Sequence, residues 1–218
     1  MLKSILRKTK KIIEKKLIKY IVWDFDDTLY VNLKLGTKLK KCYLDYLNEK
    51  SKENISFREF NLLTKNGLSW SGLVAKKLKK SEIKIINEVE KRFNKSQYLK
   101  KNSLLVKQLE KLTKYRHVIL TNSPAFEVEQ CLKKIGFKKK NNLDFFPFEK
   151  IIDCNLSKKL KPDLTPFKKV TDYTKIHPIK HLMVGNSYHS DLLPAKKAGF
   201  QAILIEEIPE YLKIKLKQ

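Results

Sequence analysis

Short apolar runs alternate with helix-like segments along most of this chain, and this alternation constrains the fold class. Four runs have the length and the continuous apolar character of buried parallel strands, namely residues 20–23, 117–120, 181–184 and 202–205. The helix-like segments lie roughly at residues 101–115, 124–135, 165–175 and 190–198. Strands that alternate with helices predict an α/β fold built on a parallel sheet.

Residues 33–99 interrupt the alternation, because they read as helical throughout and lack an apolar run of strand character. Ser56 and Glu59 have the spacing of a capping box, which opens a helix. Asn66-Gly67 separates that helix from the next, and residues 82–98 predict a longer helix. We therefore expect a small all-helical domain over residues 33–99, inserted into an α/β core made of residues 20–32 and 100–218.

Asp24 and Asp26 follow directly on the first apolar run. Residues i and i+2 of a strand face the same side, so we expect the two carboxylates to converge where the strand ends. Converging carboxylates are costly unless a cation neutralises them, and hard oxygen ligands suit Mg²⁺. Taken alone, the pair could also be an acidic turn that closes a strand.

Polar residues follow the other runs as well. Thr121 and Asn122 end the second run and lead into a predicted helix N-terminus, which is a ready anion site. Ser123 is the predicted N-cap of that helix, and Pro124 is its predicted first residue. Lys161 precedes Pro162 shortly before another helix start, and Asn186 and Asp191 follow the third run. Each set alone could be an ordinary turn, but open α/β sheets bind ligands at the carboxyl ends of their strands. Together they predict one site.

The order and spacing of these sets resemble the haloacid dehalogenase-like (HAD) hydrolase superfamily over about residues 20–206. Residues 24–29 (DFDDTL) look like the first motif, DxDxT, and residues 120–122 (LTN) look like the second. Residues 161–163 (KPD) and 185–191 look like the third and fourth. The resemblance implies a Rossmann-like core and makes residues 33–99 a helical cap between the first two motifs.

The resemblance also implies a reaction. Asp24 is the expected nucleophile, which attacks phosphorus to form an aspartyl-phosphate, and Asp26 is expected to protonate the leaving oxygen and then activate water. Lys161 is expected to neutralise charge on the phosphoryl group and on Asp24. Thr121 and the backbone amides near Asn122 are expected to hold the phosphoryl oxygens.

A metal site follows from the same resemblance, with Mg²⁺ surrounded by Asp24, the backbone carbonyl of Asp26, Asn186 and Asp191. The fourth motif usually begins Gly-Asp, whereas Asn186 stands at that place here. An amide oxygen can still coordinate Mg²⁺, but the site loses one negative charge. We therefore expect weaker metal binding, and this departure leaves a binding-only relative as an alternative.

The net charge of the chain suggests a different class of partner. The chain has 218 residues with 48 Lys+Arg and 23 Asp+Glu, a net charge of +25, which invites a nucleic-acid or anionic-membrane partner. However, nearly all the basic residues are lysine, and a phosphate-reading surface would use the bidentate fork of arginine more freely. We favour a solvated cationic surface over a nucleic-acid partner.

Residues 1–19 place apolar residues among lysines with the spacing of one helix face. A helix on an anionic membrane surface, an organelle-targeting leader, and a packed helix or frayed basic tail all fit this pattern, and we favour the last. Cys42, Cys131 and Cys154 lie far apart without a CxxC, which indicates free thiols in a reducing compartment such as the cytoplasm. Apolar runs as long as a membrane-spanning helix are absent.

We therefore expect a Mg²⁺-dependent phosphomonoester hydrolase that acts on a small soluble phosphorylated metabolite. The second acid of the first motif separates phosphatase-type members from dehalogenases, which lack it. The alternatives are a non-catalytic HAD-like binder of nucleic acid or anionic membrane, and a phosphomutase.

Overall fold

The computed structural model of the protein describes residues 18–64, 68–138 and 145–205. The described chain forms two compact units. The core unit runs to Val31 and resumes at Lys100, and the helical unit is Asn32–Leu99. The expectation for residues 1–19 falls almost wholly outside the described residues, as does the predicted break at Asn66-Gly67.

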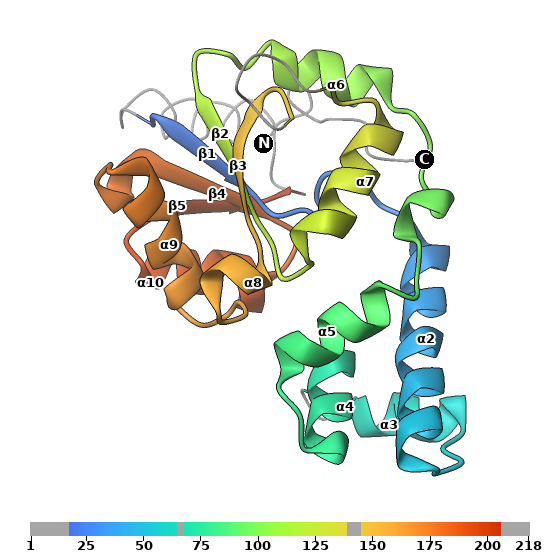
Figure 1. Ribbon diagram of the computed structural model, residues 1–218. Helices are drawn as coiled ribbons and strands as arrows, with labels where there is room; N and C mark the ends of the chain where they lie inside the picture. The colour runs from blue at the N-terminus through green and yellow to red at the C-terminus, as the bar shows by residue number, and fades with distance from the viewer. Residues whose placement is uncertain (1–17, 65–67, 139–144, 206–218) are drawn as a thin grey trace, which may run out of the picture. The chain divides into compact units, whose positions relative to one another are not determined.

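A five-stranded parallel sheet forms the centre of the core unit, in the order β3-β2-β1-β4-β5 (Figure 1). Its strands are β1 (Tyr20–Trp23), β2 (Arg116–Leu120), β3 (Phe148–Ile152), β4 (His181–Gly185) and β5 (Gln201–Leu204). In the register of the sheet, Val22 of β1 pairs with Val118 of β2 and with Met183 of β4. The predicted α/β fold with a parallel sheet is confirmed.

The strand β3 is absent from the sequence prediction, which placed no strand between the second and third apolar runs. Glu149 and Lys150 interrupt the apolar pattern of Phe148–Ile152. They are tolerated because β3 is an edge strand, where these two side chains stay partly exposed while Ile151 and Ile152 are buried.

Helices cover both faces of the sheet (Figure 1). The helices α6 (Ser103–Glu110) and α7 (Ala125–Ile135) lie on one face, and α9 (Thr165–Thr174) and α10 (Leu193–Lys197) lie on the other. Short elements complete the unit, namely α8 (Cys154–Ser157), the 3₁₀ helix η2 (Pro178–Lys180) and the π-helix η3 (Tyr188–Leu192). On the second face, Val22 and Met183 pack with Phe167 and Val170 of α9, and each of these four side chains is fully buried. Burial of one such side chain stabilises a fold by about 1.5–3 kcal/mol.

The strand order creates a switch point beside β1. The chain proceeds from β1 to β2 and β3 along one direction, and then crosses back to β4 and β5 on the other side of β1. Crossovers between parallel strands are right-handed, so the connecting helices change face at this reversal. Ligands of open α/β sheets bind outside the carboxyl ends of the strands at such a point.

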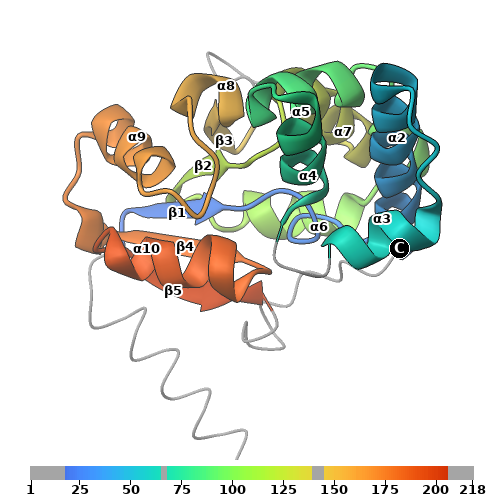
Figure 2. The ribbon, with the colours of Figure 1, turned by 90° about the horizontal axis from the view of Figure 1, so that it is seen from below.

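The helical unit contains four α-helices and one 3₁₀ helix within its described residues. They are α2 (Leu33–Ser51), α3 (Phe57–Thr64), α4 (Trp70–Leu78), α5 (Glu82–Glu90) and η1 (Lys95–Tyr98). Their shared apolar core includes Leu47, Phe60 and Val89, and α4 lies beside both α2 and α5 (Figures 1 and 2).

The helix boundaries of this unit test two local predictions. The capping box is confirmed, because Ser56 N donates to Glu59 Oε2 at 2.8 Å and Glu59 N donates to Ser56 Oγ at 3.2 Å. The single helix predicted over 82–98 is wrong, because α5 ends at Glu90 and the chain turns before η1. That turn brings the buried Lys95 ammonium within 3.7 Å of Glu90 Oε2, a contact that periodicity cannot reveal.

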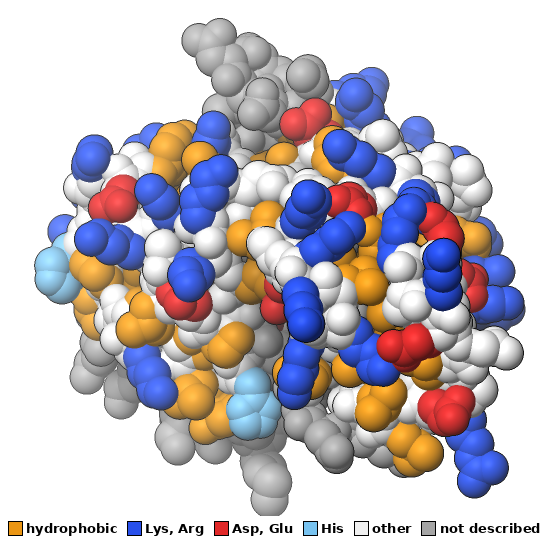
Figure 3. Space-filling model, turned by 60° about the horizontal axis from the view of Figure 1, so that its bottom comes forward, with side chains coloured by type: hydrophobic (Ala, Val, Ile, Leu, Met, Phe, Trp, Pro, Cys, Tyr) orange, Lys and Arg blue, Asp and Glu red, His pale blue; other side chains and the backbone are white. Residues whose placement is uncertain are grey.

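One face of the molecule carries its positive charge in a dispersed form. On the face drawn in Figure 3, Lys and Arg side chains are spread among acidic, apolar and uncharged ones. This distribution agrees with a solvated cationic surface, and the absence of a nucleic-acid partner stays a prediction. Within the described ranges, each helix is too short or too polar to cross a bilayer.

Candidate active site

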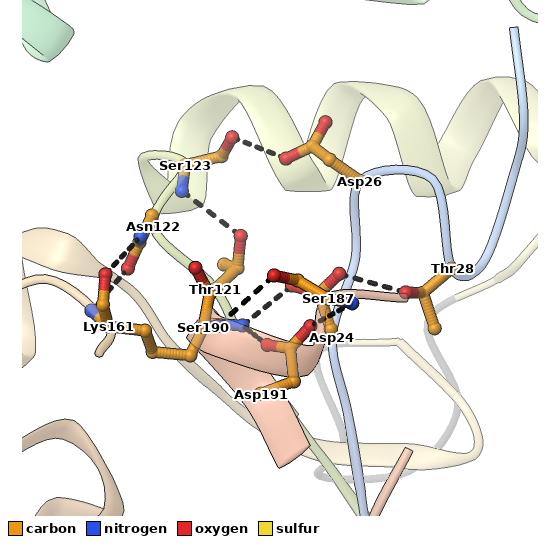
Figure 4. Close-up of polar contacts among 10 residues, drawn as sticks. All are labelled: Asp24, Asp26, Thr28, Thr121, Asn122, Ser123, Lys161, Ser187, Ser190 and Asp191. Carbon is orange, nitrogen blue, oxygen red and sulfur yellow. Dashed lines mark hydrogen bonds and ion pairs between the residues drawn. The ribbon is translucent and has the colours of Figure 1, made fainter. Parts of the chain in front are cut away.

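Four predicted site residues meet at the carboxyl end of the sheet, beside the switch point (Figure 4). Asp24 directly follows β1, Thr121 directly follows β2, Lys161 lies in the loop between α8 and α9, and Asp191 lies in η3 after β4. The parallel arrangement of the strands brings these four segments to one edge.

Asp24 is fixed by backbone and side-chain contacts. Its N–H donates to Val184 O at 2.9 Å, which continues the pairing of β1 with β4 beyond the strand. The buried carboxylate accepts hydrogen bonds on both oxygens, from Thr28 Oγ1 to Oδ2 at 2.9 Å and from Lys161 Nζ to Oδ1 at 2.7 Å. The nucleophile expected from the sequence is therefore held in one orientation.

Lys161 joins two acids through one ammonium group. Its Nζ donates to Asp24 Oδ1 and, at 2.5 Å, to Asp191 Oδ1, and the side chain is almost completely buried. Its backbone is held by the side-chain amide of Asn122, which accepts from Lys161 N at 2.8 Å and donates to Lys161 O at 3.0 Å. The Asn122 side chain thus positions the loop that carries Lys161.

Asp191 is held by the start of the π-helix. Ser187 N donates to Asp191 Oδ2 at 3.0 Å. Gly185 makes room for the carboxylate, because a Cβ atom at this position would lie 2.4 Å from Asp191 Cγ. The fourth set of polar residues therefore needs both its glycine and its aspartate.

The electrostatics of this cluster are unbalanced. Burial raises the pKa of Asp24 to about 6, with Lys161 opposing the shift and the charges of Asp191 and Asp26 adding to it. Burial by itself would lower the pKa of Lys161, but the two carboxylates raise it above its ordinary value. Two buried carboxylates consequently share one ammonium, and the cluster can accommodate a further cation.

Asp26 lies near this cluster but binds other partners. Ser123 Oγ donates to Asp26 Oδ2 at 2.6 Å, and the Tyr30 hydroxyl donates to Asp26 Oδ1. The prediction that the strand geometry makes both carboxylates converge is wrong in its premise, because β1 ends at Trp23. Asp24 and Asp26 stand in the turn that follows, each with its own set of hydrogen bonds (Figure 4).

The predicted anion site after β2 is partly filled by the protein itself. The first helical N–H of α7, that of Ala125, donates to Asp153 Oδ2 at 2.9 Å, and Ser123 N donates to Thr121 Oγ1 at 3.0 Å. Ser123 does not cap α7, whose N-cap is Pro124. Among the described residues the Thr121 hydroxyl donates to none, so its proton remains available for a ligand oxygen.

A family comparison agrees with this arrangement. The model of the haloacid dehalogenase-like hydrolases matches residues 21–205, which include all four strand-end sets. The chain belongs to this family. The resemblance inferred from the motifs is therefore confirmed, and the HAD fold places each motif at the edge of the sheet described above.

Solved structures of other HAD proteins share the fold. A HAD phosphatase from Thermococcus onnurineus is 21% identical, with a TM-score of 0.58 and 86% of each chain covered. The putative HAD-hydrolase YfnB from Bacillus subtilis, bound to magnesium, is 16% identical, with a TM-score of 0.53 and 86% of each chain covered. An L-2-haloacid dehalogenase from Xanthobacter autotrophicus is 15% identical with a TM-score of 0.54, over 85% of this chain and 76% of that one. No curated protein sequence matches the chain.

The donor set of this HAD chain suits a hard divalent cation. Asp24 and Asp191 supply buried carboxylate oxygens whose joint charge exceeds that of Lys161. The described residues contain no group of three or more His, Cys, Asp and Glu side chains that could hold a metal. A complete coordination shell here would need oxygens of other kinds, as the expected backbone carbonyl of Asp26 and amide of Asn186 would be. The Asn186 side chain is exposed and makes no hydrogen bond to a described residue, so its role as a ligand stays a prediction.

Several contacts of the site escaped the sequence analysis. The Asn122 amide on the Lys161 backbone spans 39 residues, and the Ser123 hydroxyl on Asp26 spans 97. Ser123 had a sequence signal, its place beside Pro124, but that signal indicated a helix cap. The contact of Tyr30 with Asp26 had no sequence signal, because a hydroxyl four residues beyond an acid is common in any loop.

Proposed function

We propose that this HAD-family chain is a phosphomonoester hydrolase that forms a covalent aspartyl-phosphate on Asp24. The observation that carries the proposal is the separation of two acids into two environments. The buried Asp24 is oriented by Thr28 and the ammonium of Lys161, whereas Asp26 accepts hydrogen bonds from the hydroxyls of Tyr30 and Ser123. Two carboxylates in unlike environments suit two different roles, those of nucleophile and proton carrier.

In the first half-reaction, a carboxylate oxygen of Asp24 forms a bond to phosphorus as the bond between phosphorus and the leaving oxygen breaks. Protonated Asp26 gives its proton to that leaving oxygen, so an alcohol departs and Asp26 becomes a carboxylate. Lys161, already on Asp24, also attracts the phosphoryl oxygens, and the Thr121 hydroxyl can donate to one of them.

In the second half-reaction, water attacks the phosphorus of the aspartyl-phosphate and gives a proton to the Asp26 carboxylate. The bond between phosphorus and Asp24 breaks, inorganic phosphate leaves, and both acids return to their starting states. Splitting hydrolysis into two displacements replaces one difficult step by two easier ones. The sum is one ester and one water converted to one alcohol and one phosphate.

Mg²⁺ belongs to the proposal as the cation that Asp24, Asp191, the Asp26 carbonyl and Asn186 would hold. When bound, it would offset the repulsion between the anionic nucleophile and the anionic phosphate. The chain's own contribution is the excess of buried negative charge at this point, which Lys161 alone does not neutralise.

The wider family contains dehalogenases, but the residues favour phosphate chemistry. Dehalogenation of a haloacid needs no proton on its leaving halide, so a second acid with its own hydrogen-bonded setting has no task there. Asp26 gives an ester hydrolase the proton that its alkoxide leaving group requires.

We infer that the helical unit acts as the cap that selects among small phosphorylated metabolites, and that the protein works in the cytoplasm. Substitutions confined to the helical unit are then expected to change the ranking of substrates by kcat/KM. They should leave the requirement for Asp24 unchanged.

A phosphate-release assay on the purified full chain tests the proposed function. We expect turnover of p-nitrophenyl phosphate and of at least one phosphorylated metabolite with Mg²⁺, and its loss after chelation with EDTA. Asp24→Asn should abolish release, while the matched exposed control Asp27→Asn should retain it. Chloride release from a 2-haloacid without phosphate release would overturn the proposal in favour of dehalogenation.

A further inference from the structure

Two hydroxyl groups hold the carboxylate of Asp26, one on each oxygen. The Tyr30 hydroxyl donates to Oδ1, and Ser123 Oγ donates to Oδ2 at 2.6 Å. Figure 4 shows Asp26 facing Ser123, apart from the group formed by Asp24, Lys161 and Asp191. The direction of the Asp26 carboxyl group is therefore set by residues outside the four family motifs.

Tyr30 is fixed by packing. Its side chain is only 2% exposed, and its ring meets Phe25 edge to face with centroids 5.3 Å apart. The turn after β1 is closed by Leu29 N donating to Phe25 O at 3.0 Å, and a backbone bridge pairs Asp26 with Tyr30. The turn that presents Asp26 thus also returns the tyrosine hydroxyl to it.

Ser123 is fixed by the turn that follows β2. It is buried there, and its N–H donates to Thr121 Oγ1. A serine before Pro-Ala would ordinarily cap the helix that follows. Here Ala125 N donates to Asp153 Oδ2 instead, and the Ser123 hydroxyl donates to Asp26.

We propose that Tyr30 and Ser123 are positioning residues that hold Asp26 in the orientation for proton transfer to the leaving oxygen. The inference rests on the proposed function. A hydroxyl can donate to an oxygen of a carboxylate and also to an oxygen of a carboxylic acid, so both partners can stay bonded as Asp26 loses and regains its proton. The single acid proton is then left to point at the leaving oxygen. A lysine or arginine in either place would instead favour the anionic form alone.

The leaving group of the substrate reveals this role. An alkyl alkoxide is a poor leaving group and depends on the proton from Asp26, whereas p-nitrophenolate departs without one. A misplaced proton donor should therefore slow the cleavage of an alkyl phosphate much more than that of p-nitrophenyl phosphate. A residue that only supported the fold would slow both equally.

The experiment compares kcat/KM for glycerol phosphate and p-nitrophenyl phosphate with Mg²⁺ in Tyr30→Phe, Ser123→Ala and the double variant. Since general acid catalysis contributes about 10²–10⁴-fold, we expect about a tenfold loss for glycerol phosphate in each single variant and about 10²-fold in the double variant. For p-nitrophenyl phosphate we expect less than about a threefold loss, and Ser123→Thr should restore most of the rate.

Tyr173→Phe is the matched control, because this hydroxyl contacts Glu149 O at 3.5 Å, far from the site, and both rates should stay unchanged. Equal losses on the two substrates, or no loss on either, would overturn the positioning role. A wild-type chain that released no phosphate would overturn the proposed function instead.

Crystal structures of the wild type and the double variant examine the same contact without turnover. We expect the Asp26 carboxylate to rotate when both hydroxyls are removed. An unchanged Asp26 orientation in the double variant would overturn the inference, whatever the activity of the wild type.

Discussion

The two ends of the parallel sheet in the core unit arrange their charged groups in opposite ways. At the amino ends of the strands, Arg116 makes two hydrogen bonds to Glu149, from Nε to Oε1 at 2.6 Å and from Nη2 to Oε2 at 2.7 Å. The guanidinium also lies over the Tyr20 ring, 4.7 Å from its centroid. At the carboxyl ends, Asp24 and Asp191 share the single ammonium of Lys161.

The pKa values reflect this contrast. The hydrogen bonds to Glu149 raise the pKa of Arg116, so the folded protein favours the charged form of this side chain. Burial raises the pKa of Asp24 to about 6, so the folded protein disfavours the charged form of this side chain. At the amino end of the sheet the charged groups are paired with each other. The carboxyl end carries excess negative charge that a cation or a ligand can neutralise. Substitutions at the two ends should therefore differ in their effects on activity and on stability.

The largest expected effect is that of Asp24→Asn on activity. Loss of the nucleophile should lower kcat by about 10⁴-fold or more, as with other covalent catalysts. In EDTA at pH 8, the same substitution should raise the free energy of unfolding. The folded-state pKa of Asp24, about 6, lies above the ordinary value of 3.8, so its buried charge opposes folding.

The sign of that stability effect can be checked by pH. As the pH falls below about 6, folded Asp24 becomes protonated and its cost declines, and the cost is lost only near the ordinary value of 3.8. The higher Tm of Asp24→Asn should therefore approach that of the wild type over this range. Thermal unfolding between pH 8 and pH 5 measures the difference, with Asp27→Asn as the exposed control. A Tm gap that widens as the pH falls would contradict the assigned environment.

Lys161→Met should damage both activity and stability. Removal of one partner from a buried ion pair leaves uncompensated charge, here on two carboxylates, and should lower the free energy of unfolding by about 3–5 kcal/mol at pH 8. The loss of electrostatic stabilisation should lower kcat by about 10²–10³-fold. Urea unfolding and phosphate release measure the two effects, and the exposed Lys159→Met should show neither.

Gly185→Ala should disturb the carboxyl end by a steric route. The new Cβ would stand 2.4 Å from Asp191 Cγ, so the Asp191 side chain or the backbone at residue 185 must shift. We expect about 1–3 kcal/mol of destabilisation, and a displacement of about 1 Å should cost about 10²-fold in kcat. Gly36→Ala is the control for stability, because its Cβ would meet only Trp70 Cη2 at 3.9 Å. Wild-type kcat in Gly185→Ala would show that Asp191 need not occupy this position.

Glu149→Gln should have the smallest effect and should act at the amino end alone. Arg116 is largely exposed, so the lost ion pair should cost only about 0.2–1 kcal/mol, less at high salt. Phosphate release should be unchanged. A kcat that fell with Glu149→Gln would break the functional division between the two ends of the sheet.

Much of the core and its site could be predicted from local patterns. Residues 20–23, 117–120 and 181–184 are buried on both faces of the sheet, so their apolar runs were continuous and visible. Their order along the chain predicted parallel strands, whose ends meet at one edge. Asp24, Thr121 and Asp191 could be predicted to gather there for that reason, and Lys161 from its place in the order of the motifs.

The edge strand β3 and the division of the segment 82–98 could not be predicted in this way. Glu149 is polar within β3 because it pairs with Arg116 of the neighbouring strand. The helix ends before Lys95, and the Lys95 ammonium approaches Glu90. Each departure depends on a partner that periodicity does not register.

The sequence by itself determined that this HAD chain has a parallel sheet and a set of acids, a hydroxyl and a lysine at its carboxyl edge. Only the tertiary structure decided which partner holds each of them. In the folded chain, Asp24 accepts hydrogen bonds from Lys161 and Thr28, and Asp26 accepts them from Tyr30 and Ser123. The Asn122 side-chain amide binds the Lys161 backbone. The physical reason is that hydrogen bonds are directional and short, so their pairing depends on where the strands, turns and helix ends lie after packing.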